Sequence, residues 1–207
     1  LQDKGEFELA IENYARAVEI QPNFAKAYNN MGSAYIRIMD LEAAVKSYGK
    51  AIELNADYYE AQTNLGVAFE LMGELDEAVA NYKKALAVAP TYCRAQFGLG
   101  NAYKAKGELG AALNSYKKII QIESDNAEAL YNMGLTLQEM GKVEEAITSF
   151  QTAIEITPDH FNAHNALGTA FITKNDSASA MQHFGIAIRE APDLIEAYDN
   201  MGSVLLH

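Results

Sequence analysis

The sequence predicts an all-α protein built as a solenoid of antiparallel helix pairs. The first observation is a glycine that recurs every 34 residues, at Gly32, Gly66, Gly100, Gly134, Gly168 and Gly202. The second is an alanine column with the same interval, at Ala10, Ala44, Ala78, Ala112, Ala146 and Ala180. The third is an aromatic residue four positions after each alanine, at Tyr14, Tyr48, Tyr82, Tyr116, Phe150 and Phe184. Coincident columns at one fixed period are typical of stacked helix–turn–helix repeats.

The period divides the chain into five complete repeats with a partial repeat at each end. The complete repeats span residues 25–58, 59–92, 93–126, 127–160 and 161–194. Residues 1–24 are expected to form the second helix of an earlier repeat, and residues 195–207 the first helix of a later one. With only 4 prolines and no Pro/Gly/Ser-rich linker, the sequence predicts a single array over residues 1–207.

The glycine column indicates how the helices pack. In the expected first helix of a repeat, Leu65, Gly66 and Phe69 share one face. A glycine inside a helix costs about 1 kcal/mol relative to alanine. Because the glycine nevertheless recurs at one register, we expect a neighbouring helix to approach closely there.

Turn and cap residues mark the expected helix ends. Residues that favour the N-cap precede each first helix, at Asn23, Asp57, Thr91, Asp125, Asp159 and Asp193. The turn inside each pair is expected at residues that tolerate a left-handed backbone, namely Gly5, Gly73, Gly107, Gly141 and Asn175. Met39 occupies this register in the repeat 25–58, so that turn is expected to differ.

These columns resemble the tetratricopeptide repeat (TPR), and the resemblance covers essentially the whole chain. It implies a right-handed superhelix of antiparallel helix pairs. It also implies a non-catalytic scaffold for protein–protein interaction. In such a scaffold, a protein or peptide segment binds along the concave groove.

Composition and charge exclude several other classes. The formal net charge is −12 and the isoelectric point is about 4.7, so nucleic acid and acidic membrane surfaces are not expected as partners. No apolar run is long enough for membrane insertion. Cys93 is the only cysteine, so no internal disulfide is possible. These features favour a soluble, cytoplasmic protein.

The motifs that carry chemistry are missing or incomplete. His160 and His164 have the spacing of two metal ligands on a helix, but His160 falls at a loop–helix junction and His164 at a packing register. Gly98 and Gly100 do not follow an expected strand, so they do not form a dinucleotide fingerprint. We therefore predict no catalytic residue, no metal and no cofactor, and a protein that is not an enzyme.

The candidate binding site is the face of each first helix opposite the packing glycine. Counted from that glycine, it holds the residues six, three and two before it and one and four after it. Asparagine recurs there, and its amide can both donate to and accept from a peptide backbone. The candidate peptide-binding residues are Asn29, Asn30, Asn64, Arg94, Phe97, Asn101, Lys104, Tyr131, Asn132, Asn165 and Asn200.

This series of amides resembles the asparagine ladder in the TPR superhelix of O-linked N-acetylglucosamine transferase, and is similar to the amides in kinesin light chain grooves. The resemblance implies that the asparagines hold peptide main chain. Two alternatives remain open at this point. The asparagines could bridge neighbouring helices inside the scaffold, and Phe97 and Tyr131 could pack inward.

The carboxylate clamp that TPR domains use for chaperone tails is incomplete. The best register offers Asn29, Ser33, Asn64, Arg94 and Gly98, of which only Asn64 and Arg94 fit. Recognition of an Hsp70 or Hsp90 tail is therefore not expected.

Two further functional hypotheses follow from the ends of the chain. Since the array begins and ends within a repeat, the chain could be the substrate-recruiting arm of a larger enzyme, such as a glycosyltransferase. Alternatively, exposed solenoid ends could stack into an end-to-end homo-oligomer, as in a self-assembling scaffold on a bacterial organelle or complex.

Overall fold

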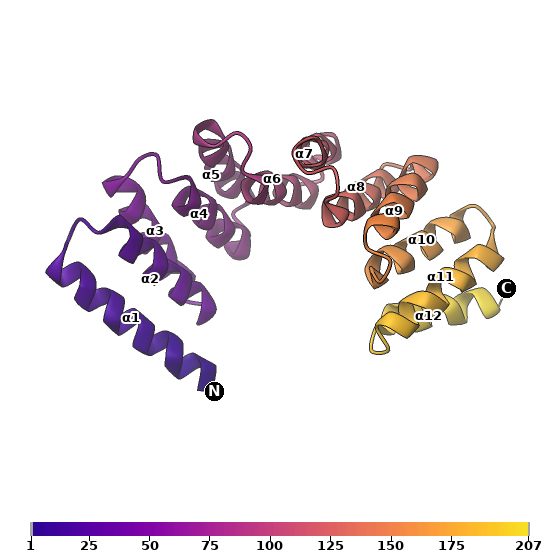
Figure 1. Cartoon of the computed structure of the whole chain (residues 1–207), viewed down its shortest axis with the longest axis horizontal. Helices are drawn as coiled ribbons and strands as arrows, with labels where there is room; N and C mark the ends of the chain where they lie inside the picture. The colour runs from indigo at the N-terminus through magenta and orange to yellow at the C-terminus, as the bar shows by residue number, and fades with distance from the viewer. Residues whose placement is uncertain (1, 207) are drawn as a thin grey trace. The chain divides into compact units, whose positions relative to one another are not determined.

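A computed structural model describes residues 2–206, with side chains described from residue 5 onward. This part of the chain contains helices and no strand (Figure 1). The helices are α1 (Gln2–Ile20), α2 (Ala25–Arg37), α3 (Leu41–Leu54), α4 (Tyr59–Met72), α5 (Leu75–Val88), α6 (Cys93–Ala105), α7 (Leu109–Ile122), α8 (Ala127–Glu139), α9 (Val143–Ile156), α10 (Phe161–Thr173), α11 (Ser177–Glu190) and α12 (Ile195–Leu205). None of the described helices is both long and apolar enough to span a bilayer.

The helices reproduce the expected pairing. Each complete repeat holds one first helix and one second helix, from α2 and α3 in residues 25–58 to α10 and α11 in residues 161–194. Helix α1 supplies the second helix before them and α12 the first helix after them. The prediction of an all-α repeat of helix pairs is confirmed.

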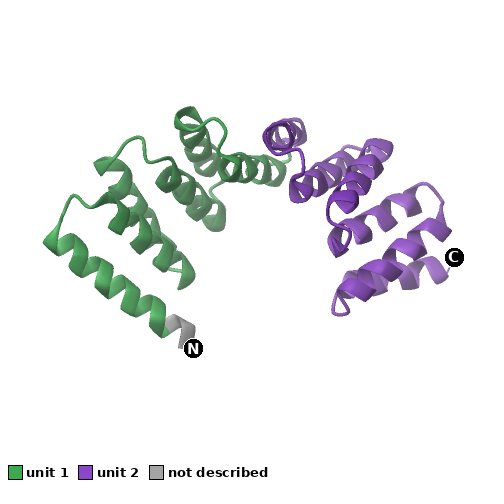
Figure 2. Ribbon diagram, viewed as in Figure 1, with its two compact units in different colours: residues 1–107 green, residues 108–207 purple. Residues whose placement is uncertain are grey.

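The chain forms two compact units, residues 1–107 with α1–α6 and residues 108–207 with α7–α12 (Figure 2). In each unit, the first helices of consecutive repeats contact one another: α2 with α4, α4 with α6, α8 with α10, and α10 with α12. The second helices within either unit make no contact of comparable extent among the described residues. The first helices therefore form the inner layer of each unit. That all five repeats form one array stays a prediction.

The glycine and aromatic columns meet in the core, as expected. A Cβ atom added to Gly32 would lie 2.7 Å from the ring of Tyr48, and one added to Gly134 would lie 2.5 Å from the ring of Phe150. Both rings are buried. Real Cβ atoms do not approach a ring this closely, so only glycine lets the first helix pack on this aromatic residue. The expected close approach is confirmed at four glycines of the column, Gly32, Gly66, Gly134 and Gly168.

The turn inside each pair is closed by a left-handed residue. Gly73, Gly107 and Gly141 have φ values of 79°, 74° and 74°, and Asn175 has 59°. The expectation that Met39 would make a different turn is wrong, because its φ is 62°. The amide of Asp40 donates to the carbonyl of Tyr35 at 3.0 Å, so the same backbone closure is kept with an unfavourable residue.

Two other local expectations are wrong. Gly5 lies inside α1, and each N-cap falls one residue after the predicted one, at Phe24, Tyr58, Tyr92, Asn126, His160 and Leu194. The amide of Phe24 donates to the carbonyl of Gln21 at 3.1 Å, and later turns repeat this pattern. The predicted cap residue is therefore part of the turn, and the helix starts after it.

Candidate peptide-binding face

The inner layer of unit 108–207 contains a pocket of about 320 Å³ between α8 and α10. Its lining residues are Tyr131, Leu135, Gln138, Glu139, Asn162, Asn165, Ala166 and Thr169. All of them except Glu139 stand at the offsets from Gly134 or Gly168 that define the predicted binding face. Tyr131, Leu135 and Ala166 give the pocket an apolar wall, and the amides, Thr169 and one carboxylate give it a polar one.

In unit 1–107, two of the predicted asparagines contact each other. The side-chain amide of Asn64 on α4 donates to Oδ1 of Asn29 on α2 at 2.9 Å, and both residues are buried. Asn29 in turn donates to Oδ1 of Asn30 at 3.3 Å. The Asn29–Asn64 pair is therefore an amide bridge between two first helices. A carboxamide has two N–H donors and two acceptor lone pairs, so this bridge uses only part of its capacity.

Unit 108–207 contains a second amide bridge with the same spacing. The amide of Asn200 on α12 donates to Oδ1 of Asn165 on α10 at 3.1 Å, and the two residues are 35 positions apart, as Asn29 and Asn64 are. The spacing exceeds the repeat period by one. An amide bridge therefore joins the position three before one packing glycine to the position two before the next.

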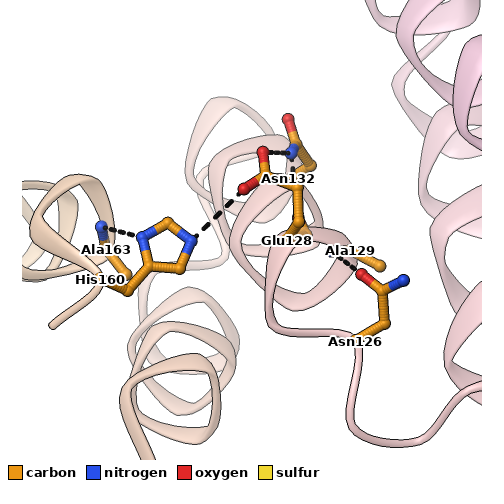
Figure 3. A network of polar contacts seen from close by, with 6 residues as sticks. All are labelled: Asn126, Glu128, Ala129, Asn132, His160 and Ala163. Atoms are coloured by element: carbon orange, nitrogen blue, oxygen red, sulfur yellow. Dashed lines mark hydrogen bonds and ion pairs between the residues drawn. The ribbon is translucent and has the colours of Figure 1, made fainter. Parts of the chain in front are cut away.

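Asn132 shares its register with Asn64 but bonds within its own helix. Its side-chain nitrogen donates to the backbone carbonyl and to the carboxylate of Glu128, both at 2.9 Å. Figure 3 shows Glu128 between Asn132 on one side and His160 on the other. Nε2 of His160 lies 3.4 Å from the Glu128 carboxylate, and Nδ1 of His160 accepts from the amide of Ala163 at 3.3 Å.

This arrangement keeps Glu128 ionised. The hydrogen bond from His160 lowers the pKa of Glu128, partial burial opposes that shift, and the hydrogen bond from Asn132 adds to it. The Glu128 side chain is 59% exposed. The predicted binding face of α8 therefore presents a negative charge to solvent at neutral pH.

Helix α6 carries the other four predicted residues. Arg94 is exposed, whereas Phe97, Asn101 and Lys104 are partly buried. Burial and the hydrogen bond from its hydroxyl to Glu70, at 2.7 Å, raise the pKa of Tyr82, and the positive charge of Arg94 partly opposes this. The charge of Arg94 is therefore close enough to the Tyr82 hydroxyl to affect its pKa.

The two histidines that have metal-ligand spacing in the sequence contact different partners in the structure. His160 pairs with Glu128, whereas Nδ1 of His164 lies 2.9 Å from Nδ1 of His183, and Nε2 of His164 lies 3.1 Å from the carbonyl of Pro158. His164 is buried. Burial lowers the pKa of both His164 and His183, so both imidazoles are held neutral.

Five pocket residues stand at the sequence offsets but were not among the predicted binding residues, namely Leu135, Gln138, Asn162, Ala166 and Thr169. The asparagines recur from repeat to repeat, whereas these residues do not form a column. Their positions relative to the packing glycines are the sequence signal that identifies them.

The fold and this inner face define a helical-repeat protein of the kind that is generally a non-catalytic interaction scaffold. The chain belongs to the TPR family: a family model described as "TPR repeat" matches residues 1–38, 40–73, 71–107, 100–141 and 138–175. A comparison with curated protein sequences finds none that matches.

Solved structures share the fold. The crystal structure of YrrB, described as a TPR protein with an unusual peptide-binding site, has a TM-score of 0.72 at 24% identity over 91% of this chain and 97% of that chain. A MamA crystal structure has a TM-score of 0.72 at 25% identity over 80% of this chain and 91% of that one. TTC0263, a thermophilic TPR protein of Thermus thermophilus, has a TM-score of 0.68 at 22% identity over 88% of this chain and all (100%) of its own.

Proposed function

We propose that this protein is a non-enzymatic interaction scaffold that binds an extended segment of a partner polypeptide across its first helices. The observation that carries the proposal is the pocket between α8 and α10, since its lining follows the offsets that define the binding face. A cavity with apolar walls and a few polar groups is the usual form of a binding site. Membership of the TPR family supports the protein-binding role.

The two amide bridges change which residues we assign to the ligand. Asn29, Asn64, Asn165 and Asn200 hold first helices together, so their substitution would alter stability as well as binding. Asn162 and Gln138 line the pocket and take no part in those bridges. They are therefore the residues on which binding is tested most cleanly.

The test is selection of peptides from a random library displayed on phage, followed by fluorescence anisotropy with the selected peptides. Asn162→Trp fills the pocket and should raise Kd at least about tenfold. Gln151→Trp, on an exposed position of α9, is the matched control and should leave Kd unchanged. Thermal unfolding of both variants checks that the fold is kept. Equal affinity of Asn162→Trp and the wild type, or a library that yields no binder, contradicts the proposal.

A further inference from the structure

The first helices of the two units carry opposite formal charge. In unit 108–207, the charged residues of the first helices α8, α10 and α12 are four carboxylates, Glu128, Glu139, Glu196 and Asp199, with no lysine or arginine. In unit 1–107, the first helices α2, α4 and α6 carry Lys26, Arg37, Arg94 and Lys104 against Glu60 and Glu70. The formal charges of these two inner layers are therefore −4 and +2.

The negative charge lies on the binding face of unit 108–207. Glu128 and Glu196 are six residues before a packing glycine, Asp199 is three before one, and Glu139 lines the pocket. All four residues are exposed. A ligand segment that lies along this face therefore passes four carboxylates, and an acidic segment would be repelled.

We infer that the segment bound at α8–α10 is basic, with a lysine or arginine side chain in the pocket. This rests on the proposed function. The aliphatic stem of that residue lies against Tyr131, Leu135 and Ala166, and its cationic end lies beside the carboxylate of Glu139.

The spacing of the carboxylates favours a polypeptide over a metal ion. Glu128 and Glu139 are eleven residues apart on α8, which corresponds to about 16 Å along the helix axis. One cation cannot contact both carboxylates at that separation. Within the described residues, no group of three or more metal-ligating side chains is found. Charges spread over this length match several cationic side chains along an extended chain.

The experiment uses the peptide that the full chain selects from the random library, and the same peptide with every lysine and arginine replaced by glutamine. We expect the neutral peptide to bind at least about tenfold more weakly. Glu139→Gln should weaken the basic peptide several-fold and leave the neutral peptide unchanged. Glu155→Gln, an exposed carboxylate on α9, removes the same charge away from the pocket and should have little effect.

The outcomes separate this inference from the proposed function. Selected peptides without lysine or arginine, or equal binding of the basic and neutral peptides, overturn the inference. Equal losses in Glu139→Gln and Glu155→Gln overturn it too, because the attraction would then come from net charge alone. If Asn162→Trp still blocks such peptides, the proposed function stands. If it blocks none, the binding face itself is wrong.

Discussion

The inner layers of the two units differ at a pair of positions that lies between neighbouring first helices. Between α2 and α4, the pair at spacing 35 is Asn29 and Asn64, and an amide bridge joins the helices. Between α8 and α10, the pair at the same spacing is Tyr131 and Ala166, and both line the pocket. Two asparagines therefore join neighbouring first helices through their side chains, whereas a large and a small apolar residue line a pocket between them.

A third case supports this rule. Asn165 and Asn200 stand at spacing 35 in unit 108–207 and form the second amide bridge. Bridge and pocket therefore occur side by side in one unit, and they share Asn165 of α10. Whether a bridge or a pocket forms therefore depends on the residue types at this spacing, and not on which unit contains them.

The largest expected effect tests whether the first helices of both units pack on their aromatic residues in the same way. Gly32→Ala and Gly134→Ala each place a Cβ within 2.7 Å of a buried ring and should lower the free energy of unfolding by about 3 kcal/mol. Gly49→Ala in α3 meets no neighbour within 4 Å and should instead stabilise by about 0.5–1 kcal/mol. Urea unfolding measures all three. Very unequal losses at Gly32 and Gly134 would show that the two faces are built differently.

The next effect tests the amide bridge itself. Asn64→Ala leaves the buried Asn29 carbonyl without its partner and should cost about 2 kcal/mol of unfolding free energy. Asn132→Ala, at the same register but bonded within its own helix, should cost less than about 0.5 kcal/mol. Chemical denaturation of both variants gives the comparison. Equal costs would mean that the bridge contributes nothing specific.

A smaller, graded effect concerns pH. Every histidine of the chain lies in residues 108–207, and the pKa of His164 and of His183 is lowered by burial. The contribution of these two histidines to folding stability is fully present above their unfolded pKa of about 6.5. As pH falls below that value toward the lowered folded pKa, the unfolded state binds protons more readily than the folded state, and the contribution is lost.

Hydrogen exchange at pH 7 and at mildly acidic pH, corrected for intrinsic rates, should therefore show protection falling in α10 and α11 before α2 and α3. His183→Gln should weaken the difference. Loss of protection that begins in α2 and α3 would contradict this assignment.

The smallest effect concerns the turn in unit 1–107. Met39 has a positive φ that costs a side chain about 1 kcal/mol, so Met39→Gly should stabilise by about 0.5–1 kcal/mol. Asn175→Gly should gain less, because asparagine tolerates this conformation. Differential scanning calorimetry measures both changes. A destabilised Met39→Gly would show that the methionine side chain contributes more than its backbone costs.

The repeat, the helix pairs and the packing glycines could be predicted from the sequence, because each is a column that recurs every 34 residues. The amide bridges were harder to predict from the sequence. They join residues 35 apart, and columns that repeat every 34 residues do not align these two positions. The turn at Met39 was mispredicted because backbone closure outweighed residue preference. The pocket depends on a gap between two side chains, which no single-residue pattern describes.

Whether a polypeptide segment occupies the pocket between α8 and α10 is the central question. Its most direct measurement is NMR of the isotopically labelled chain with a library-selected peptide that carries a nitroxide. A peptide in the pocket should broaden the side-chain amide signals of Asn162 and Gln138 and leave those of Gln151 on α9 unaffected. Broadening confined to the second helices, or absent from both pocket amides, would contradict it.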